Sequence, residues 1–269
     1  MKIRHMDGPL EGQDTQDTFV AYDDLGGMLG GADVTSVMRD MLCPSRPHQL
    51  LIRTECEQGA LDALLGAATA RAMYLAREKQ DSPARIFCEC NPSDEERMRV
   101  LQTQGYMDDD GLVRMKKMLK RGPIIKPLPR DCVIVRDYLI DDSESKYFVE
   151  RYNAMFASDK DMDWLNELKQ RPNFARLLMV APDGLAGELV TWSDAYSGVV
   201  GVIQTPPHWQ QKGVASHLME QARNYWLDKG LVDAYFDVWT RLTGAMRLAA
   251  TTGFRPEEML LRYPGIDMF

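Results

Sequence analysis

The sequence predicts an α/β protein made of two similar units, and three observations lead to this fold class. Residues 59–119 and residues 213–266 share one order of elements, which is helix, strand, helix and strand. Local endings also repeat, because "QGY" and "LVRM" in the first stretch match "TGF" and "LLRY" in the second. Hydrophobic residues make up 45% of the 269 residues, which is enough for buried cores.

The first half contains the shorter version of the repeated unit. Two stretches, 18–38 and 48–55, come before a helix over 59–80 whose leucines and alanines recur at helical spacing. A strand at 84–91, a helix at 94–106 that ends at Gly105, and a strand at 110–119 follow. This half therefore looks like the second unit after loss of its first strand and first helices.

The second half contains the longer version. A strand at 131–140 precedes two helices, at 143–156 and 161–170, and a hairpin at 175–192 that turns at Asp183 and Gly184. A strand at 197–205 leads into the helix of the repeat. The remaining elements are a strand at 233–240, a helix at 244–254 that stops at Gly253, and a strand at 257–266 that Pro264 closes.

The stretch "KRGPIIKPLPRD" at 120–131 separates the two halves. Its three prolines and single glycine are typical of a stiff linker. We therefore expect one domain at 1–121, a linker at 122–130 and a second domain at 131–269.

Composition limits the function. The 32 Lys and Arg against 40 Asp and Glu give a net charge of −8, which argues against a nucleic-acid partner because such a partner needs a basic face. The five cysteines are odd in number and show no paired CxxC spacing, so we expect neither a disulfide framework nor a metal site. No apolar stretch suits a signal peptide or a membrane span, so we expect a cytoplasmic protein with no membrane partner. Nothing in the sequence predicts an oligomeric state.

The stretch "TPPHWQQKGVASHLMEQARNYW" at 205–226 joins a strand to a helix. Pro206 and Pro207 must end the strand, because proline lacks the N–H that a sheet requires. Apolar residues then recur at helical spacing from Val214. Gly213 and Ala215 leave the backbone at the start of this helix open to close approach, and the start of a helix attracts anions.

The segment 210–215 resembles the acetyl-CoA loop of the GNAT N-acetyltransferases, whose motif is Gln/Arg-x-x-Gly-x-Gly/Ala. The strand, double proline, loop, helix, strand, helix and "GF" ending follow in the order of that superfamily. The resemblance covers 132–269 well and the first half more faintly. It implies two GNAT-like domains, the first of them truncated, each with a central mixed and mainly antiparallel sheet flanked by helices.

The resemblance also implies acetyl-CoA as the co-substrate and assigns residues to it. The backbone of Ile203 and Thr205 would follow the pantetheine arm, and the loop would hold the pyrophosphate. That loop consists of Gln210, Gln211, Lys212, Gly213, Val214 and Ala215. An ordinary helix cap is the alternative interpretation of the same residues.

The first half does not repeat this motif. With Gly59 aligned to Gly213, Leu61 takes the position of Ala215 and Glu57 brings a negative charge towards the phosphates. We therefore expect the first copy to be degenerate and free of cofactor.

The candidate catalytic residues depart from the GNAT pattern. Many GNAT enzymes protonate the departing thiolate with a tyrosine, but Ala249 stands at that position here and Leu101 in the first copy. Tyr263 is the substitute that we predict, alongside water. Glu188 is the predicted general base, with Asp194 as a second candidate and a solvated surface carboxylate as the alternative reading of Glu188.

Three functions follow from these residues. The first is an acetyl-CoA-dependent N-acetyltransferase that acts on a primary amine of a small molecule or peptide. The second is a non-catalytic acyl-CoA-binding protein, which the missing tyrosine favours. The third is a tandem acetyltransferase of the mycothiol-synthase type. The sequence does not identify the acceptor.

Overall fold

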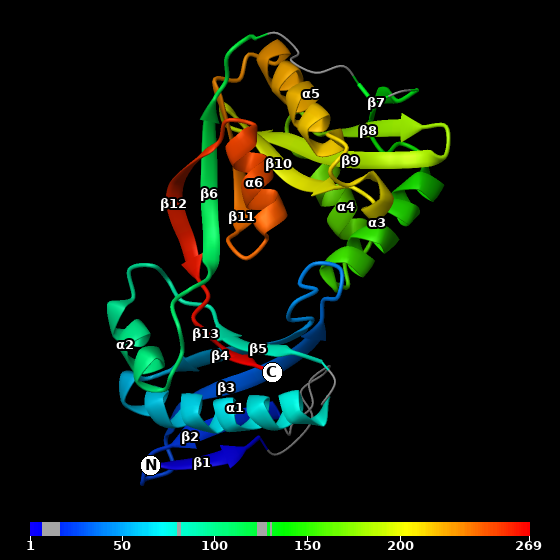
Figure 1. Cartoon of the computed structure of the whole chain (residues 1–269). Coiled ribbons are helices and arrows are strands. Elements are labelled where there is room, and N and C mark those ends of the chain that lie inside the picture. The colour runs from blue at the N-terminus through cyan, green and yellow to red at the C-terminus, as the bar shows by residue number, and fades with distance from the viewer. Residues whose placement is uncertain (7–16, 80–81, 123–127, 130) are drawn as a thin grey trace. The chain divides into compact units, whose positions relative to one another are not determined.

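The computed structural model of the protein describes residues 1–6, 17–79, 82–122, 128–129 and 131–269 (Figure 1). These residues form two compact units, each with its own sheet. The first unit contains Met1–Leu112, Met155–Ala157 and Met259–Phe269, and the second contains Val113–Ala154 and Ser158–Glu258. No helix in the described part of the chain is both long enough and apolar enough to cross a bilayer.

The first unit has a six-stranded sheet in the order β1-β2-β3-β4-β5-β13. Its strands are β1 (Lys2–His5), β2 (Thr18–Tyr22), β3 (Met28–Met38), β4 (His48–Cys56), β5 (Ala84–Cys88) and β13 (Gly265–Met268). Only the β4–β5 pair is parallel, and the other neighbours pair antiparallel. The sheet is therefore mixed and mainly antiparallel, as expected. Strand β1 was not predicted.

Two helices accompany this sheet, α1 (Gln58–Glu78) and α2 (Glu95–Thr103). Helix α1 lies along one face and packs on β3 and β4 (Figure 1). The predicted apolar stripe is confirmed, since its residues Leu64, Ala68 and Ala72 are fully buried on the face of α1 that packs on the sheet. Alanines at two of these positions bring the helix close to the sheet. The predicted helix end at Gln80 lies outside the described residues.

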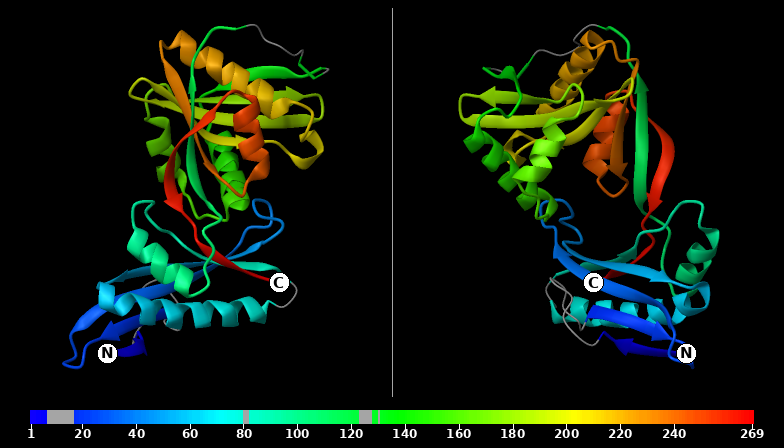
Figure 2. Two further views of the ribbon diagram at one scale, coloured as in Figure 1. Left: turned by 60° about the vertical axis from the view of Figure 1, so that its left-hand side comes forward. Right: turned by 180° about the vertical axis from the view of Figure 1, so that it is seen from behind.

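The second unit has a seven-stranded sheet in the order β12-β6-β11-β10-β9-β8-β7. Its strands are β6 (Gly111–Met118), β7 (Val133–Asp137), β8 (Ala175–Ala181), β9 (Gly184–Asp194), β10 (Ser197–Gln204), β11 (Asp233–Trp239) and β12 (Arg255–Arg262). Its helices are α3 (Asp142–Phe156), α4 (Met162–Lys169), α5 (Val214–Asp228) and α6 (Thr243–Thr251). Helices α5 and α6 cover one face, and α3 and α4 lie on the other (Figures 1 and 2).

The two sheets exchange strands between the halves of the sequence. Strand β6 follows the repeat of the first half but lies between β12 and β11 of the second sheet. The predicted single strand 257–266 is instead two strands, β12 and β13, which belong to different sheets. Pro264 separates them, because proline interrupts a ladder of hydrogen bonds. Each sheet therefore contains a strand from the other side of the predicted linker. Residues 123–127 and 130 of that linker lie outside the described residues.

Candidate active site

The parallel strands β10 and β11 separate part of the way along their length. Their pairing runs from Ser197 opposite Asp233 to Val200 opposite Phe236, and there it ends. Strand β10 nevertheless continues to Gln204 and β11 to Trp239. In a parallel pair, the backbone N–H and C=O groups that face the partner strand are hydrogen-bonded to it. Beyond Val200 β11 no longer pairs with this edge of β10, so the edge is available to an extended ligand.

A β-bulge lies where the separation begins. The register of β10 against β9 shifts between Val200 and Val202, which leaves Gly201 as the extra residue. A Cβ atom at Gly201 would lie 1.9 Å from Cζ3 of Trp192. The absence of a side chain at this residue therefore lets the indole ring of Trp192 cover the bulge.

The loop 205–213 follows β10 and ends at the start of α5. Gly213 is the N-cap of α5 with φ of +85°, a left-handed conformation that favours glycine. No side chain caps this end of α5, and its first turn contains no acidic residue. The first N–H groups of the helix therefore face outward with the positive end of the helix dipole.

Side chains around this helix start fit an anionic ligand. Lys212 is exposed, and its Nζ lies 4.7 Å from the centroid of the Trp209 ring. Nδ1 of His217 lies 2.9 Å from the carbonyl oxygen of Gly213 and donates to it. The side chain of Val214 is buried in the core, so this residue can offer only its backbone. The geometry suits a phosphate group held by amides and one lysine.

The structure brings most of the predicted cofactor residues together. Ile203 and Thr205 lie along the separated edge of β10 or directly after it, and the other predicted residues lie in the loop and at the start of α5: Gln210, Gln211, Lys212, Gly213, Val214 and Ala215. Within the described ranges, no three His, Cys, Asp or Glu side chains converge in a way that could hold a metal ion.

The first unit has no equivalent of this loop. Strand β4 passes into α1 through one residue, Glu57, which is the N-cap. The pairing of β3 with β4 also runs without a register shift, so the bulge of the second unit has no counterpart there. The carboxylate of Glu57 at a helix start would repel a phosphate group.

The structure corrects the predicted alignment of the two helices. The N-caps align Glu57 with Gly213, so Gly59 and not Leu61 takes the position of Ala215. Leu61 lies further along α1 and is buried. The predicted obstruction of the phosphates by Leu61 is therefore wrong. The missing loop and the negative charge of Glu57 are independent reasons to expect the co-substrate in the second unit alone.

Glu188, the predicted general base, is fully buried and paired. Nη2 of Arg151 lies 2.9 Å from Oε1 and 3.0 Å from Oε2, and Nε of Arg176 lies 2.7 Å from Oε2. Arg176 is itself buried and also contacts Asp137 and Glu144. Both oxygens of Glu188 thus accept hydrogen bonds from guanidinium groups, an arrangement that disfavours a role as proton acceptor and also contradicts a solvated surface carboxylate.

Tyr263, the predicted proton donor, lies in the first unit, whereas the loop lies in the second. Its ring packs edge to face on Phe87 at 5.8 Å between centroids. Burial, and then the nearby carboxylates Glu89 and Asp110, raise its pKa to about 12.

Ala249 is fully buried in the hydrophobic core of the second unit, beside Phe236 and Phe254 on the helix-covered face of the sheet. The residue that replaces the usual tyrosine therefore serves packing. A tyrosine ring at this position would meet core side chains rather than open space.

Sequence reasoning missed the partners of Glu188. Arg176 interrupts the apolar strand "ARLLMVA", and an arginine inside a buried strand indicates a buried carboxylate nearby. Arg151 gave no such signal, because it lies on a helix of mixed polarity.

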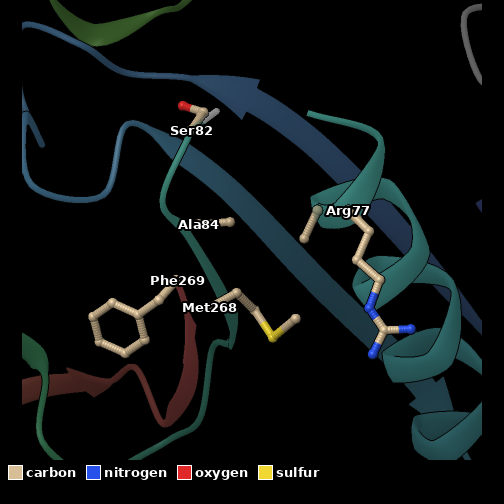
Figure 3. A pocket seen from close by; sticks show the side chains of 6 residues that line it. Arg77, Ser82, Ala84, Met268 and Phe269 are labelled. Carbon is tan, nitrogen blue, oxygen red and sulfur yellow. The ribbon is translucent and has the colours of Figure 1, made fainter. Parts of the chain in front are cut away.

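A separate hollow occurs in the first unit, near the end of α1 (Figure 3). It is lined by Ala76, Arg77, Ser82, Ala84, Met268 and Phe269. None of the predicted site residues lies in it.

Comparison with solved structures gives the fold. A GCN5-related N-acetyltransferase from Sphaerobacter thermophilus matches with a TM-score of 0.52 and 18% identity, over 96% of this chain and 82% of that one. A GCN5-related glucosamine N-acetyltransferase region of a fungal multi-domain GH3 β-N-acetylglucosaminidase matches with a TM-score of 0.50 and 13% identity, over 93% of this chain and 33% of that one. A tandem GNAT protein from the clavulanic acid biosynthesis pathway gives 0.47 and 12% identity, over 93% and 82%.

No protein-family model and no curated protein matches the sequence. At these identities the solved structures establish the architecture, and the chain has the fold of the GNAT N-acetyltransferases. The predicted fold class is confirmed.

Proposed function

We propose that the protein transfers an acetyl group from acetyl-CoA to a primary amine of a small molecule or peptide, and that the second unit carries the site. The separation of β10 from β11 directly before an uncapped helix start is the observation on which this proposal rests. A thioester with a long amide-containing arm and a pyrophosphate fits both features. The GNAT fold supports acyl transfer as the reaction class.

Each part of the co-substrate has a proposed partner. The arm would pair with the backbone of Ile203 and Thr205, whose strand edge is not used by β11 beyond Val200. The pyrophosphate would accept hydrogen bonds from the amides at the start of α5, with Lys212 supplying positive charge. Gly213 allows this approach because it has no side chain and adopts the left-handed conformation at the start of the helix.

The reaction requires one proton transfer before one bond exchange. An alkyl ammonium must lose a proton, because its pKa is about 10. The amine nitrogen then bonds to the thioester carbonyl carbon, the carbon–sulfur bond breaks, and CoA leaves as a thiolate. The nitrogen loses its second proton, which protonates the thiolate to the free thiol directly or through water. Of the two carboxylates considered on β9, Asp194 is exposed and Glu188 is buried between arginines, so Asp194 is the better candidate to accept the proton.

The thiolate needs little assistance. A thiol with a pKa of about 8.5 leaves readily near neutral pH. Tyr263 stays a prediction as proton donor, with water as the alternative.

A non-catalytic acyl-CoA-binding protein is the second candidate function. It is considered because of two residues: Ala249 stands in the buried core at the position of the GNAT tyrosine, and Glu188 is held by arginines, whereas the GNAT fold itself supports acyl transfer. A binding protein needs only the strand edge and the loop.

A screen of primary amines with acetyl-CoA and the full chain, followed by detection of free thiol, separates these functions. An enzyme releases CoA thiol in proportion to an amine in the panel. Binding of acetyl-CoA without thiol release for any amine would contradict the enzyme proposal and support the binding protein.

A further inference from the structure

The strand exchange brings a cation from the first half of the sequence to β11. Arg114 on β6 pairs with Asp237 on β11 through two bonds of 2.8 Å, from Nε to Oδ1 and from Nη2 to Oδ2. The pair is bidentate, the geometry in which a guanidinium fixes a carboxylate most firmly. Both side chains are 30% exposed.

Asp237 lies on a defined face of the sheet. Its neighbours Phe236 and Val238 belong to the core under α5 and α6, so alternation along the strand directs Asp237 to the opposite face. Asp237 also follows Phe236, the last residue of β11 that pairs with β10. It is therefore the first polar side chain on this face beside the separated strands.

A second contact holds the same group of residues. The guanidinium of Arg114 lies 4.2 Å from the centroid of the Tyr235 ring, and the Tyr235 hydroxyl donates to Oδ2 of Asp194 at 3.1 Å. The arginine thus contacts the two β11 side chains of this face that border the start of the separation, Tyr235 and Asp237. Lys116, two residues further along β6, pairs with Asp233 and Glu257 instead.

The charge on this face of the sheet favours a cation. Asp237, Asp233 and Glu257 form ion pairs there with Arg114 and Lys116, and the carboxylate of Asp194 accepts a hydrogen bond from the Tyr235 hydroxyl. These four carboxylates outnumber the two cations that pair with them. A bidentate guanidinium uses one side of a carboxylate, and the remaining lone pairs of Asp237 stay able to accept a hydrogen bond from an ammonium group.

We propose that Asp237 binds the ammonium group of a cationic acceptor, and that Arg114 is a positioning residue that the first half of the chain supplies to this site. The inference rests on the proposed acetyl transfer. It names the acceptor class, a diamine or polyamine whose reacting amine loses its proton while a second ammonium group stays charged and binds Asp237. It also gives the first half a function in the reaction although that half has no loop for the co-substrate.

The test uses the full chain and a panel of primary amines that contains 1,4-diaminobutane and uncharged aromatic amines. We expect wild-type turnover with the cationic amines, and we expect D237N to raise their KM about 30-fold, because a hydrogen bond to a charged group is lost. R114K keeps the positive charge but cannot form the two parallel hydrogen bonds of the guanidinium to Asp237, and we expect it to raise the KM of the cationic amines about threefold. The affinity for acetyl-CoA stays unchanged in both variants, and K116Q is the matched control with an unchanged KM.

The exchanged pair R114D/D237R separates recognition from structure. It restores an ion pair and with it the melting temperature, but it places a cation where the ammonium binds, so we expect the KM of the cationic amines to stay high. Recovery of KM in this double variant, an unchanged KM in D237N, or turnover of uncharged amines alone would overturn the inference. Turnover of no amine at all would instead overturn the proposed function.

Discussion

Replacement of Glu188 by glutamine tests whether this residue serves structure or catalysis. Glu188 is fully buried, and both of its oxygens accept bonds from Arg151 and Arg176 at 2.7 to 3.0 Å. Glutamine keeps the shape but removes the charge, so two guanidinium groups lose their shared partner. Breaking a buried pair in this way costs about 3 kcal/mol.

The assay is thermal and chemical unfolding of the full chain, with thiol release measured on the same preparations. A loss of about 3 kcal/mol corresponds to a fall of roughly 6–12 °C in melting temperature. E144Q is the matched control: Glu144 also contacts Arg176, at 3.3 Å, but is 55% exposed, so its loss costs about 1 kcal/mol or less. An unchanged melting temperature together with a large fall in turnover at intact acetyl-CoA binding would refute this reasoning and make Glu188 the base.

Three further predictions concern the buried position of Ala249, the pH dependence of the rate and the β-bulge at Gly201. A249Y adds a ring to a fully buried position in a packed core, so we expect about 1–3 kcal/mol of destabilisation in denaturant unfolding; an equally stable and faster variant would contradict this. We expect the pH–rate profile to rise through one pKa and not to fall near pH 10. Burial raises the pKa of both Tyr235 and Tyr263 to about 12, so both hydroxyls stay protonated at pH 10. A falling limb centred near pH 10 would indicate an ordinary tyrosine as the acid. G201A places a Cβ atom against the ring of Trp192, so we expect denaturant unfolding to show about 1–3 kcal/mol of destabilisation. The double variant G201A/W192L should regain this stability, because the smaller side chain relieves the contact. An unchanged stability in G201A would show that the bulge tolerates a side chain.

Local patterns explain why much of the fold and the loop could be predicted. The stripe of Leu64, Ala68 and Ala72 encodes the buried face of α1 through its spacing alone. Pro206 and Pro207 mark the end of β10, and Gly213 adopts the left-handed backbone that favours glycine at a helix start. Each of these features depends on residues within one or two turns of each other.

Long-range pairing explains what the sequence could not predict. The partner strands of β6 and β13 lie in the other half of the chain, and no local pattern distinguishes them from strands of their own half. Glu188 looked available because Arg151 lies 37 residues away. The alignment of Gly59 with Gly213 failed for a different reason, since the loop is missing from the first unit and glycine identity alone does not fix a helix start.

Titration of acetyl-CoA into the intact chain in a calorimeter tests the central claim most directly, which is that the second unit alone binds the co-substrate at the start of α5. We expect one site per chain. We also expect G213E to abolish the heat of binding, because it brings a side chain and a negative charge to the open helix start that would hold the pyrophosphate. The left-handed backbone at this residue costs the variant about 1–2 kcal/mol, so we expect the melting temperature to fall by only about 2–8 °C and the chain to stay folded. Two sites per chain, or unchanged binding in G213E, would contradict the claim.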